Sequence, residues 1–293
     1  MAEVKDFICI KVMRDRKAST ITLSNPGHTA ALLEAFGMEM AAPNETPMAS
    51  GVKRAKTGKD LLSEGNRYAA LVDSLLYLST MTRPDISFAF GVLSRFMSLP
   101  EQAHMRAAKG VLRYLCGTAR LGVAYASSEP LQGYVAADWA GDVDVRRSTT
   151  GFIFTVNGGS VAWERKRQST VATFTAEAEH VAAAMATKKA LWLRKLLGVL
   201  DVDGEAVLMG EDNQPCLALI NNSAATGRTN HVDFAYHTVR DYQTRRDVAF
   251  YFLPSAKLPA DGLTKPLPAT AFTAFRCAIG VGPELGGANM AQW

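Results

Sequence analysis

Residues Gly151–Arg167 read GFIFTVNGGSVAWERKR, and TAEAEHVAAAMATKKALWLRKLLGVL follows at Thr175–Leu200. The first stretch places β-branched and aromatic runs on both sides of Asn157-Gly158-Gly159, which is typical of two strands joined by a tight hairpin turn. In the second stretch, apolar residues recur every three or four positions, and this spacing predicts one long helix. Its expected buried stripe includes Ala178, Met185, Trp192 and Leu196. A strand pair followed by a long helix indicates a sheet covered by a helix.

The sequence on both sides of this stretch extends the same pattern. Upstream, Gly122–Ala126 and Gly133–Ala137 alternate like strands, so three hairpin-connected strands precede the helix. Downstream, strand and helix patterns alternate. A mixed sheet with helices on its faces, an α/β sandwich, is therefore predicted. The downstream elements are a strand at Ala206–Met209, helices at Gln214–Asn221 and Val232–Thr244, a strand at Val248–Leu253 and a final helix at Pro268–Ala278.

The first 120 residues have a different organisation. Residues 4–23 predict two short strands, and a helix follows at residues 29–36. Residues 38–66 lose periodicity and combine prolines, glycines and lysines, as in an exposed basic linker. Residues 67–119 show three runs of helical spacing, which predict three short helices.

Composition restricts the class of protein. The 293 residues are 48% hydrophobic and 20% charged, which is typical of a globular chain with a sizeable core. No eighteen-residue stretch lacks charge and no apolar run follows Met1, so we expect no membrane span, no signal peptide and an intracellular location, cytoplasmic or nuclear. Four scattered cysteines indicate neither a zinc site nor a disulfide framework. The net charge of +4 permits contact with a polyanion without requiring it.

Acidic residues stand at the ends of several predicted elements. Strand ends meet at one edge of an α/β sheet, so these carboxylates can converge there. Such a cluster repels itself unless a divalent cation neutralises it, and oxygen ligands favour Mg²⁺ or Mn²⁺. The alternative is that these acids only cap helices and interact with helix dipoles. The residues concerned are Asp138, Glu177, Glu179, Asp212 and Asp261.

A set of motifs in one order carries a family resemblance. The second half of the chain resembles the ribonuclease H region of copia-type retrotransposon Pol polyproteins, and the first half resembles the end of the reverse transcriptase and the segment that joins the two. The motifs of the second half are DWAGD (138–142), RRSTTGFIF (146–154), TAEAEH (175–180), EDNQ (211–214), TNHVDFAYH (229–237) and LPADGLTK (258–265). Those of the first half are VKDFICIKVMRDR (4–16), SLLYLSTMTRPDISFA (74–89), LSRFM (93–97) and AAKGVLRYLCGT (107–118).

The resemblance implies an organisation along the chain. A reverse transcriptase C-terminal remnant is expected at residues 1–37, followed by the linker at 38–66 and a helical connection at 67–119. A ribonuclease H-like domain with a mixed five-stranded sheet and flanking helices is expected at 120–281, before a disordered tail at 282–293. The polymerase palm is absent from this chain, so we expect no polymerase activity unless that part is supplied in trans by another Pol chain.

The resemblance also implies an activity, the hydrolysis of the RNA strand of an RNA/DNA hybrid with two Mg²⁺ or Mn²⁺ ions. The family holds these ions with four acids from four elements. Carried onto this chain, three of them are Glu179, Asp212 and Asp261, while the first-strand position holds Ala136. Glu177 lies on another side of the helix from Glu179 and is expected to be a solvated first-turn acid.

Ala136 is the departure that matters most, because the family acid at that position bridges both ions. Asp138 lies two residues further on, on the same face of an extended strand but displaced by about 6.7 Å. That displacement exceeds the separation of the two ions, about 4 Å, so substitution by Asp138 would require a bulge or a register change. We therefore expect a weak or inactive enzyme. The alternative is a non-catalytic module that binds nucleic acid or protein.

Polar and basic residues near these acids are candidates for nucleic-acid binding. The basic ones suit backbone phosphates if they lie beside the acidic edge, although a charge run is commonly just a solvated face. The two amides could read 2′-hydroxyl groups in a minor groove, or cap the following helix, or do both. The candidates are Arg146, Arg147, Arg165, Lys166, Arg167, Asn213 and Gln214.

Overall fold

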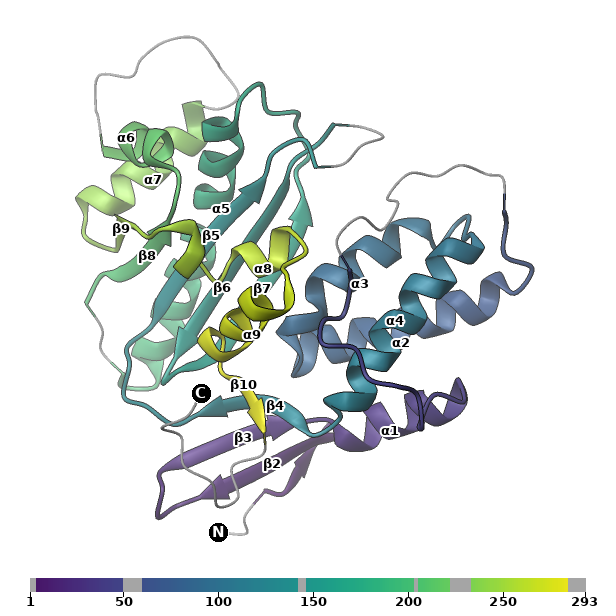
Figure 1. The fold of residues 1–293 in the computed structure, drawn as a ribbon. Helices are drawn as coiled ribbons and strands as arrows, with labels where there is room; N and C mark the ends of the chain where they lie inside the picture. The colour runs from purple at the N-terminus through teal and green to yellow at the C-terminus, as the bar shows by residue number, and fades with distance from the viewer. Residues whose placement is uncertain (1–3, 50–59, 142–145, 203–204, 222–232, 284–293) are drawn as a thin grey trace. The chain divides into compact units, whose positions relative to one another are not determined.

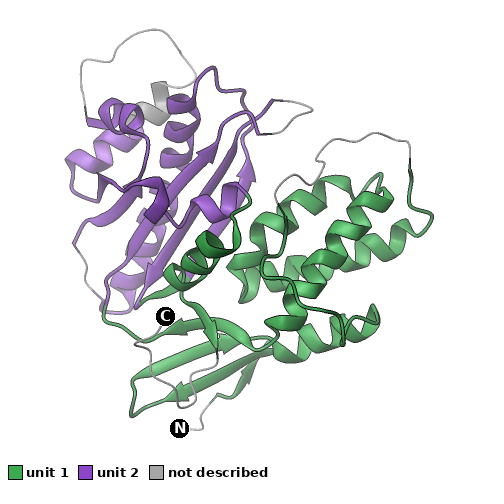
Figure 2. Ribbon diagram, viewed as in Figure 1, with its two compact units in different colours: residues 1–128, 158–160, 266–293 green, residues 129–157, 161–265 purple. Residues whose placement is uncertain are grey.

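The computed structural model describes residues 4–49, 60–141, 146–202, 205–221 and 233–283 (Figure 1). The chain divides into two compact units (Figure 2). Unit 1 comprises residues 1–128, 158–160 and 266–293, and unit 2 comprises residues 129–157 and 161–265. In the described part of the chain, no helix combines the length and the apolar character needed to cross a bilayer.

Unit 1 contains an antiparallel sheet and a group of helices. The strands are ordered β1-β2-β3-β4-β10, so the first three and the last come from opposite ends of the chain. Their bounds are β1 Asp6–Phe7, β2 Ile10–Asp15, β3 Thr20–Ser24, β4 Leu121–Tyr125 and β10 Val281–Pro283. The helices are α1 Pro26–Ala35, α2 Gly65–Met81, α3 Ser87–Leu93, α4 Gln102–Gly117 and α9 Ala269–Ala278, with short 3₁₀ turns at Pro84–Ile86 and Ser94–Phe96.

The helices predicted between residues 67 and 119 are present as α2, α3 and α4. Leu71, Leu75 and Leu78 recur at helical spacing in α2, and all three side chains are fully buried. Pro84 begins the 3₁₀ turn that separates α2 from α3, where its missing N–H costs no hydrogen bond. The sequence pattern therefore identified both the interior and the break of this segment.

Unit 2 is built on a mixed sheet with the strand order β7-β6-β5-β8-β9. Strand β5 pairs antiparallel with β6 and parallel with β8, and β8 pairs parallel with β9. The predicted mixed five-stranded sheet with flanking helices is thus confirmed. The strands are β5 Gln132–Asp138, β6 Thr149–Val156, β7 Gly159–Arg167, β8 Val207–Glu211 and β9 Val248–Phe252. The helices are α5 Thr175–Val199, α6 Gln214–Asn221, α7 Asp233–Thr244 and α8 Asp261–Thr264, with a 3₁₀ turn at Ser255–Lys257.

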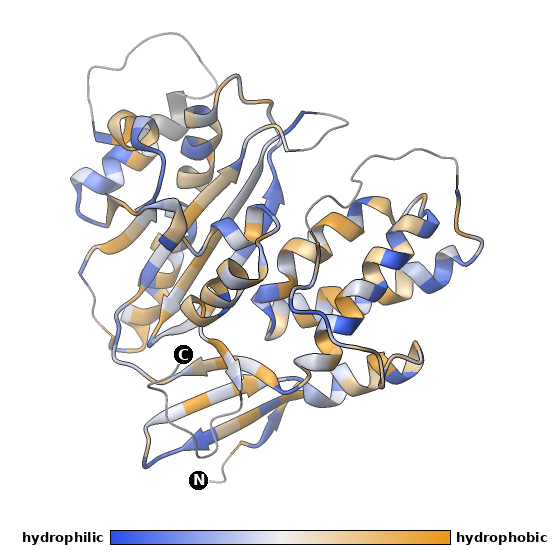
Figure 3. Ribbon diagram, in the orientation of Figure 1, coloured by the Kyte–Doolittle hydropathy of each residue, from blue (hydrophilic) through white to orange (hydrophobic). Residues whose placement is uncertain are grey.

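Helix α5 covers one face of this sheet through its alanines. Ala182, Ala186 and Ala190 pack in one buried cluster with Val135 and Phe152 of the central strands, and these strands carry marked apolar bands (Figure 3). Small side chains allow the helix axis to lie close to the sheet. The prediction that a stripe of larger residues is the buried face of α5 was wrong in the C-terminal half of the helix. There Trp192 and Leu196 are exposed, at 55% and 41%. Alanine contributes little hydrophobic contrast, so the sequence pattern favoured the larger side chains over the true contact face.

The unit boundary differs from the domain boundary expected at residue 120. Strand β4 pairs with β3 in the sheet of unit 1, and helix α9 and strand β10 also belong to unit 1. An alternating pattern predicts a strand but does not identify its partner, and this accounts for the difference. Residues 38–49 form neither helix nor strand, but Met48 is buried, and α2 begins at Gly65, inside the range predicted as a linker. Residues 50–59 of the predicted linker lie outside the described residues, as do residues 284–293 of the tail predicted at 282–293, whereas Gly282 and Pro283 belong to β10.

Candidate functional site

The carboxyl ends of β5 and β8 lie at the same edge of the sheet of unit 2, because the two strands are parallel. Their last recorded pair is Tyr134 with Gly210, and two residues further along come Ala136 and Asp212. The first turns of α5 and the start of α8 border this edge, since α5 contacts β5 and α8 contacts both β5 and β6. The topology therefore brings four separate segments of the chain together.

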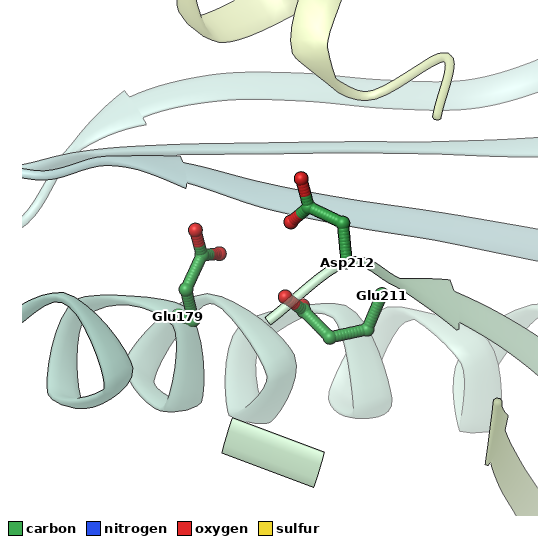
Figure 4. A group of neighbouring side chains, drawn as sticks. All are labelled: Glu179, Glu211 and Asp212. Carbon is green, nitrogen blue, oxygen red and sulfur yellow. The ribbon is translucent and has the colours of Figure 1, made fainter. Parts of the chain in front are cut away.

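Three carboxylates meet at this edge. Glu179 comes from α5, Glu211 ends β8 and Asp212 follows it, and one oxygen of each lies within 4.8 Å of the others (Figure 4). Glu211 is 0% exposed and Glu179 is 7% exposed, while Asp212 is half-buried. Three acids at this separation and depth form a concentrated source of negative charge.

Protein groups satisfy this cluster only in part. The backbone N–H of Asn213 donates to Glu211 Oε1 at 3.0 Å, and the Ser255 hydroxyl donates to Asp212 Oδ2. Glu179 Oε2 and Glu211 Oε2 are buried, and neither has a hydrogen-bond partner among the residues that the structure describes. A buried carboxylate oxygen without a hydrogen-bond partner destabilises the folded chain, so these two atoms are suited to contact a bound ligand.

The electrostatics agree with this geometry. Burial raises the pKa of Glu179, and the charges of Glu211, Asp212 and Asp261 raise it further. Burial likewise raises the pKa of Glu211; the N–H groups of Asn213 and Asp212 oppose the rise, and the charge of Asp212 adds to it. Both pKa values rise for the same main reason, because an ionised carboxylate is destabilised when it loses contact with water.

The donor set suits a small divalent cation. All donors are carboxylate oxygens, which Mg²⁺ and Mn²⁺ prefer over nitrogen or sulfur. Glu179 and Glu211 each have a buried oxygen without a partner among the described residues, and one oxygen of each lies within 4.8 Å of the other and of Asp212, so a cation there would neutralise charge that the protein leaves uncompensated. The residues at this edge therefore fit the kind of ion that the family resemblance implies.

Two other predicted acids lie near this cluster but outside the group of three. Asp261 begins α8, and Lys265 Nζ contacts its Oδ2 at 2.6 Å. Burial raises the pKa of Asp261, Lys265 opposes this, and the charges of Asp212 and Asp138 raise it again. Asp138 ends β5 and is half-buried. Asp261 and Asp138 thus extend the negative edge without completing the cluster.

Position 136, where the family acid is expected, is apolar and closed. Ala136 is 1% exposed and packs in a small cluster with Leu258 and Ala260, just before Asp261 in sequence. The backbone N–H of the next residue, Ala137, interacts with the carboxylate of Glu179 and lowers its pKa. Ala136 therefore stands between the segments that carry Glu179 and Asp261, at the centre of the edge, but offers no oxygen.

The predicted basic residues lie at the same end of the sheet. Asp138 at the end of β5 pairs with Thr149 at the start of β6, and the backbone N–H of Gln168, just after β7, donates to the carbonyl of Ser148. The run Arg165–Arg167 at the end of β7 and the pair Arg146–Arg147 before β6 are thus brought side by side. Lys166 and Arg167 are exposed. Two strand spacings, about 10 Å, separate β7 from β5.

The two predicted amides have different surroundings. Asn213 Oδ1 accepts the backbone N–H of Cys216 at 2.8 Å, which is the hydrogen bond of an N-cap, so the capping role that the sequence left open is present. Gln214 is exposed. Glu177 was expected to be solvated, and this was wrong. It is 9% exposed, and its Oε2 accepts both the N–H and the hydroxyl of Thr173 at 2.7 Å.

Glu211 is the member of the cluster that the sequence argument did not select. It directly precedes Asp212 in the EDNQ motif, and consecutive strand residues point to opposite faces. Because β8 ends at Glu211, that alternation no longer applies to Asp212, and both carboxylates turn toward the same region. The available signal was an acidic pair at a strand end.

Comparison with known proteins gives consistent relatives. No family model matches the chain. The chain is 35% identical over 288 residues to a retrovirus-related Pol polyprotein from transposon TNT 1-94 of Nicotiana tabacum, a match that covers 96% of this chain and 22% of the relative. It is 48% identical over 128 residues to secreted RxLR effector protein 161 of Plasmopara viticola, which covers 43% of this chain and 90% of that protein. The chain thus spans about a fifth of the length of the Pol relative.

Among solved structures, LC11-RNase H1 in complex with an RNA/DNA hybrid matches with 16% identity and a TM-score of 0.35, over 45% of this chain and 92% of that one. Unit 2 itself has the mixed five-stranded sheet with flanking helices that the sequence predicts.

Proposed function

This chain belongs to the copia-type retrotransposon Pol family, and we propose that unit 2 is a metal-dependent ribonuclease H whose cleavage of RNA/DNA hybrids is impaired by Ala136. The observation that carries the proposal is the grouping of Glu179, Glu211 and Asp212 within 4.8 Å at the carboxyl edge of the sheet. The resemblance assigns two of these residues, Glu179 and Asp212, to metal binding.

The roles of the residues follow from their positions. Glu179 and Asp212 would hold a divalent cation, and Asp261 would add a further carboxylate from the start of α8. When bound, such a cation supplies Lewis-acid activation of water and stabilises the leaving oxygen in phosphodiester hydrolysis. Ser255 and Asn213 hold the cluster by donating hydrogen bonds to Asp212 and Glu211. These donors orient the carboxylates that would otherwise repel one another.

The impairment follows from the missing oxygen at the centre of the edge. Ala136 cannot contribute a ligand, and its side chain packs against Leu258 and Ala260. Asp138 influences Asp261 electrostatically but is not one of the three acids whose oxygens lie within 4.8 Å. The proposed enzyme therefore lacks the first-strand carboxylate that the family resemblance implies as a metal ligand.

A nucleic acid is the proposed partner. The basic runs Arg146–Arg147 and Arg165–Arg167 lie at the same end of the sheet as the acids. Strand β7, which carries the second run, is two strand spacings or about 10 Å from β5. A duplex whose backbone phosphates contact these residues could present a neighbouring phosphodiester to the acidic edge. Gln214, exposed at the start of α6, would contact a sugar hydroxyl.

The test is a cleavage assay on a labelled RNA/DNA hybrid with Mg²⁺ or Mn²⁺, comparing the wild type with Ala136→Asp. We expect wild-type cleavage near background and a gain of at least about 100-fold in the variant, because a metal ligand contributes several kcal/mol to stabilising the transition state. Ala136→Asn is the matched control, since it has nearly the same size and shape but no charge.

Circular dichroism of each variant checks that the side chain is accommodated beside Leu258 and Ala260. Robust turnover by the wild type would contradict the impairment, and equal rates for Ala136→Asp and Ala136→Asn would contradict the metal-ligand role of position 136. No cleavage by a folded Ala136→Asp variant would count against the ribonuclease proposal as a whole.

A further inference from the structure

Glu211 is as deeply buried as any acid at the edge, yet the family assignment gives it no role. We infer that Glu211 is a direct cation ligand, and that with Glu179 and Asp212 it forms a site for one divalent cation. The inference deepens the proposed function and rests on it, because both place a cation at this edge of the sheet. It departs from the family pattern in the identity of one ligand and in the number of ions.

The first observation is that Glu211 is not accounted for by protein contacts. Its side chain is 0% exposed, and Oε2 has no hydrogen-bond partner among the described residues. A buried carboxylate that only supports the fold is normally hydrogen-bonded at both oxygens or paired with a cation. Its Oε1 accepts a hydrogen bond from the N–H of Asn213. One oxygen of the Glu211 carboxylate lies within 4.8 Å of an oxygen of Glu179 and of Asp212 (Figure 4).

The second observation concerns Glu179, which approaches the cluster from helix α5. Glu179 is 7% exposed, and its Oε2 likewise has no hydrogen-bond partner in the part of the chain that the structure covers. Two buried oxygens without partners, on separate elements, thus border one region. A water molecule could donate a hydrogen bond to each oxygen but would leave the negative charge uncompensated, whereas a cation would satisfy both oxygens and the charge.

The spacing decides how many cations fit. Oxygens bound to one Mg²⁺ or Mn²⁺ lie about 2.1 Å from it, so two of them are about 3 to 4.2 Å apart, depending on their angle at the ion. The three oxygens here lie within 4.8 Å of one another, so small side-chain adjustments place all of them on one ion. A second ion would need further bridging oxygens, and Ala136 supplies none. Asp261, which borders the site from the start of α8, is outside the group of three acids, and its Oδ2 contacts Lys265.

The ligand class is therefore a single small, hard divalent cation. Waters would complete its coordination, because three carboxylate oxygens leave positions open around an octahedral ion. Mn²⁺ is the appropriate probe, since it takes the same ligands as Mg²⁺ and binds such sites more tightly. Its paramagnetism also makes free and bound ion distinguishable without any assay of cleavage.

The experiment is a titration of the full chain with Mn²⁺, followed by electron paramagnetic resonance of the free ion, for the wild type and for Glu211→Gln. We expect one ion per wild-type chain and an affinity at least about tenfold weaker in Glu211→Gln, because a direct ligand is lost. Glu177→Gln is the matched control: it removes a buried glutamate from the same helix end as Glu179 but one whose oxygen already accepts two hydrogen bonds from Thr173. Its affinity should stay within about twofold of the wild type.

Glu211→Asp keeps the carboxylate and shortens the side chain, so it serves if Glu211→Gln fails to fold, and intermediate affinity is expected. Unchanged affinity in a folded Glu211→Gln variant, with loss of binding in Glu179→Gln, would overturn the role of Glu211 and leave the proposed ribonuclease site intact. Two ions bound to the wild type would overturn the single-cation site. The absence of any binding, together with an inactive Ala136→Asp variant, would overturn both proposals.

Discussion

Each unit of the molecule buries a group of ionisable side chains. Those of unit 1 are paired with one another, whereas those of unit 2 lack a counter-ion among the described residues. In unit 1, Arg83 and Asp85 are each 1% exposed and form a bidentate pair, with Nε to Oδ1 at 2.9 Å and Nη2 to Oδ2 at 2.8 Å. Tyr114 donates to Asp85 at 2.6 Å, and Arg83 also donates to the carbonyl and hydroxyl of Thr118 at 2.9 Å. In unit 2, Glu179 and Glu211 are buried beside another acid, with one oxygen of each lacking a hydrogen bond from any described residue.

The difference separates structural charge from charge kept for a ligand. Around Asp85, burial alone would raise the pKa, but the charge of Arg83 and the hydrogen bonds from Arg83 and Tyr114 outweigh it and lower the pKa. Around Glu211, burial and the neighbouring acid raise the pKa, and only backbone N–H groups oppose them. A buried ion that its own chain neutralises holds the fold together. A buried ion that its own chain leaves uncompensated is poised for an external cation.

The largest expected effect on stability comes from breaking the buried Arg83–Asp85 pair of unit 1. Asp85→Asn leaves the Arg83 guanidinium buried without its counter-ion, so the free energy of unfolding of unit 1 should fall by about 3–5 kcal/mol. Hydrogen exchange of backbone amides in α2 and α4 measures this loss within unit 1.

The matched control for this variant is Glu64→Gln, which breaks the exposed pair of Glu64 with Arg67 at 3.4 Å. That change should cost less than about 1 kcal/mol, because solvent already screens the pair. Equal losses in the two variants would mean that the buried pair contributes no more than a surface pair.

Acidification should weaken the same group. The pKa of Asp85 is lowered in the folded chain, so the unfolded chain takes up a proton first as the pH falls. The contribution of Asp85 is therefore complete above about pH 5 and is lost as the pH falls through about 4 toward the folded pKa. Amide exchange in α4 between pH 6 and pH 3 measures it, and the decline should be shallower in Asp85→Asn. Parallel pH profiles in both proteins would refute this assignment.

The smallest expected effect is a gain in stability, and it comes from removing the charge of Glu211 in unit 2. Without metal, Glu211→Gln removes one of three mutually repelling acids, so the free energy of unfolding of unit 2 should rise by about 1 kcal/mol. Amide exchange in β8 and α5, recorded with a chelator present, measures this gain.

Adding Mg²⁺ should change the relative stability of the wild type and Glu211→Gln. At one hundred times its dissociation constant, a cation that binds only the folded chain adds about 2.7 kcal/mol to the wild type. The variant should gain less at the same concentration, so the order of stability reverses. A wild type that is more stable than Glu211→Gln even in chelator would show that Glu211 supports the fold.

Local pattern was sufficient for most elements of the fold. The hairpin around Asn157-Gly158-Gly159 is present because Asn157 and Gly158 adopt positive φ, at 52° and 78°, which these residue types tolerate. The helices at Leu71 and Leu112 followed from spacing alone, since one face of each had to be buried. The contact face of α5 was missed, because alanine is buried there without being strongly hydrophobic.

The candidate site was predictable only as far as residue type and order allow. Glu179 and Asp212 were named from the motifs, and the cluster contains both. Glu211 was missed because the predicted strand ended at Met209 and the family pattern assigns only Asp212 of the EDNQ motif. The placement of Asp138 and Asp261 beside the cluster rather than within it depends on side-chain contacts, such as that of Lys265 with Asp261.

The sequence by itself determined the helices and strands, the absence of an acid at position 136 and the presence of acids at the strand and helix ends. Only the tertiary structure decided that β4 joins the sheet of unit 1 and that Glu211 completes a group of three carboxylates. The physical reason is range: periodicity and turn propensity act between residues a few positions apart. Strand partners and the meeting of carboxylates depend on backbone segments that are distant along the chain and share buried space only after folding.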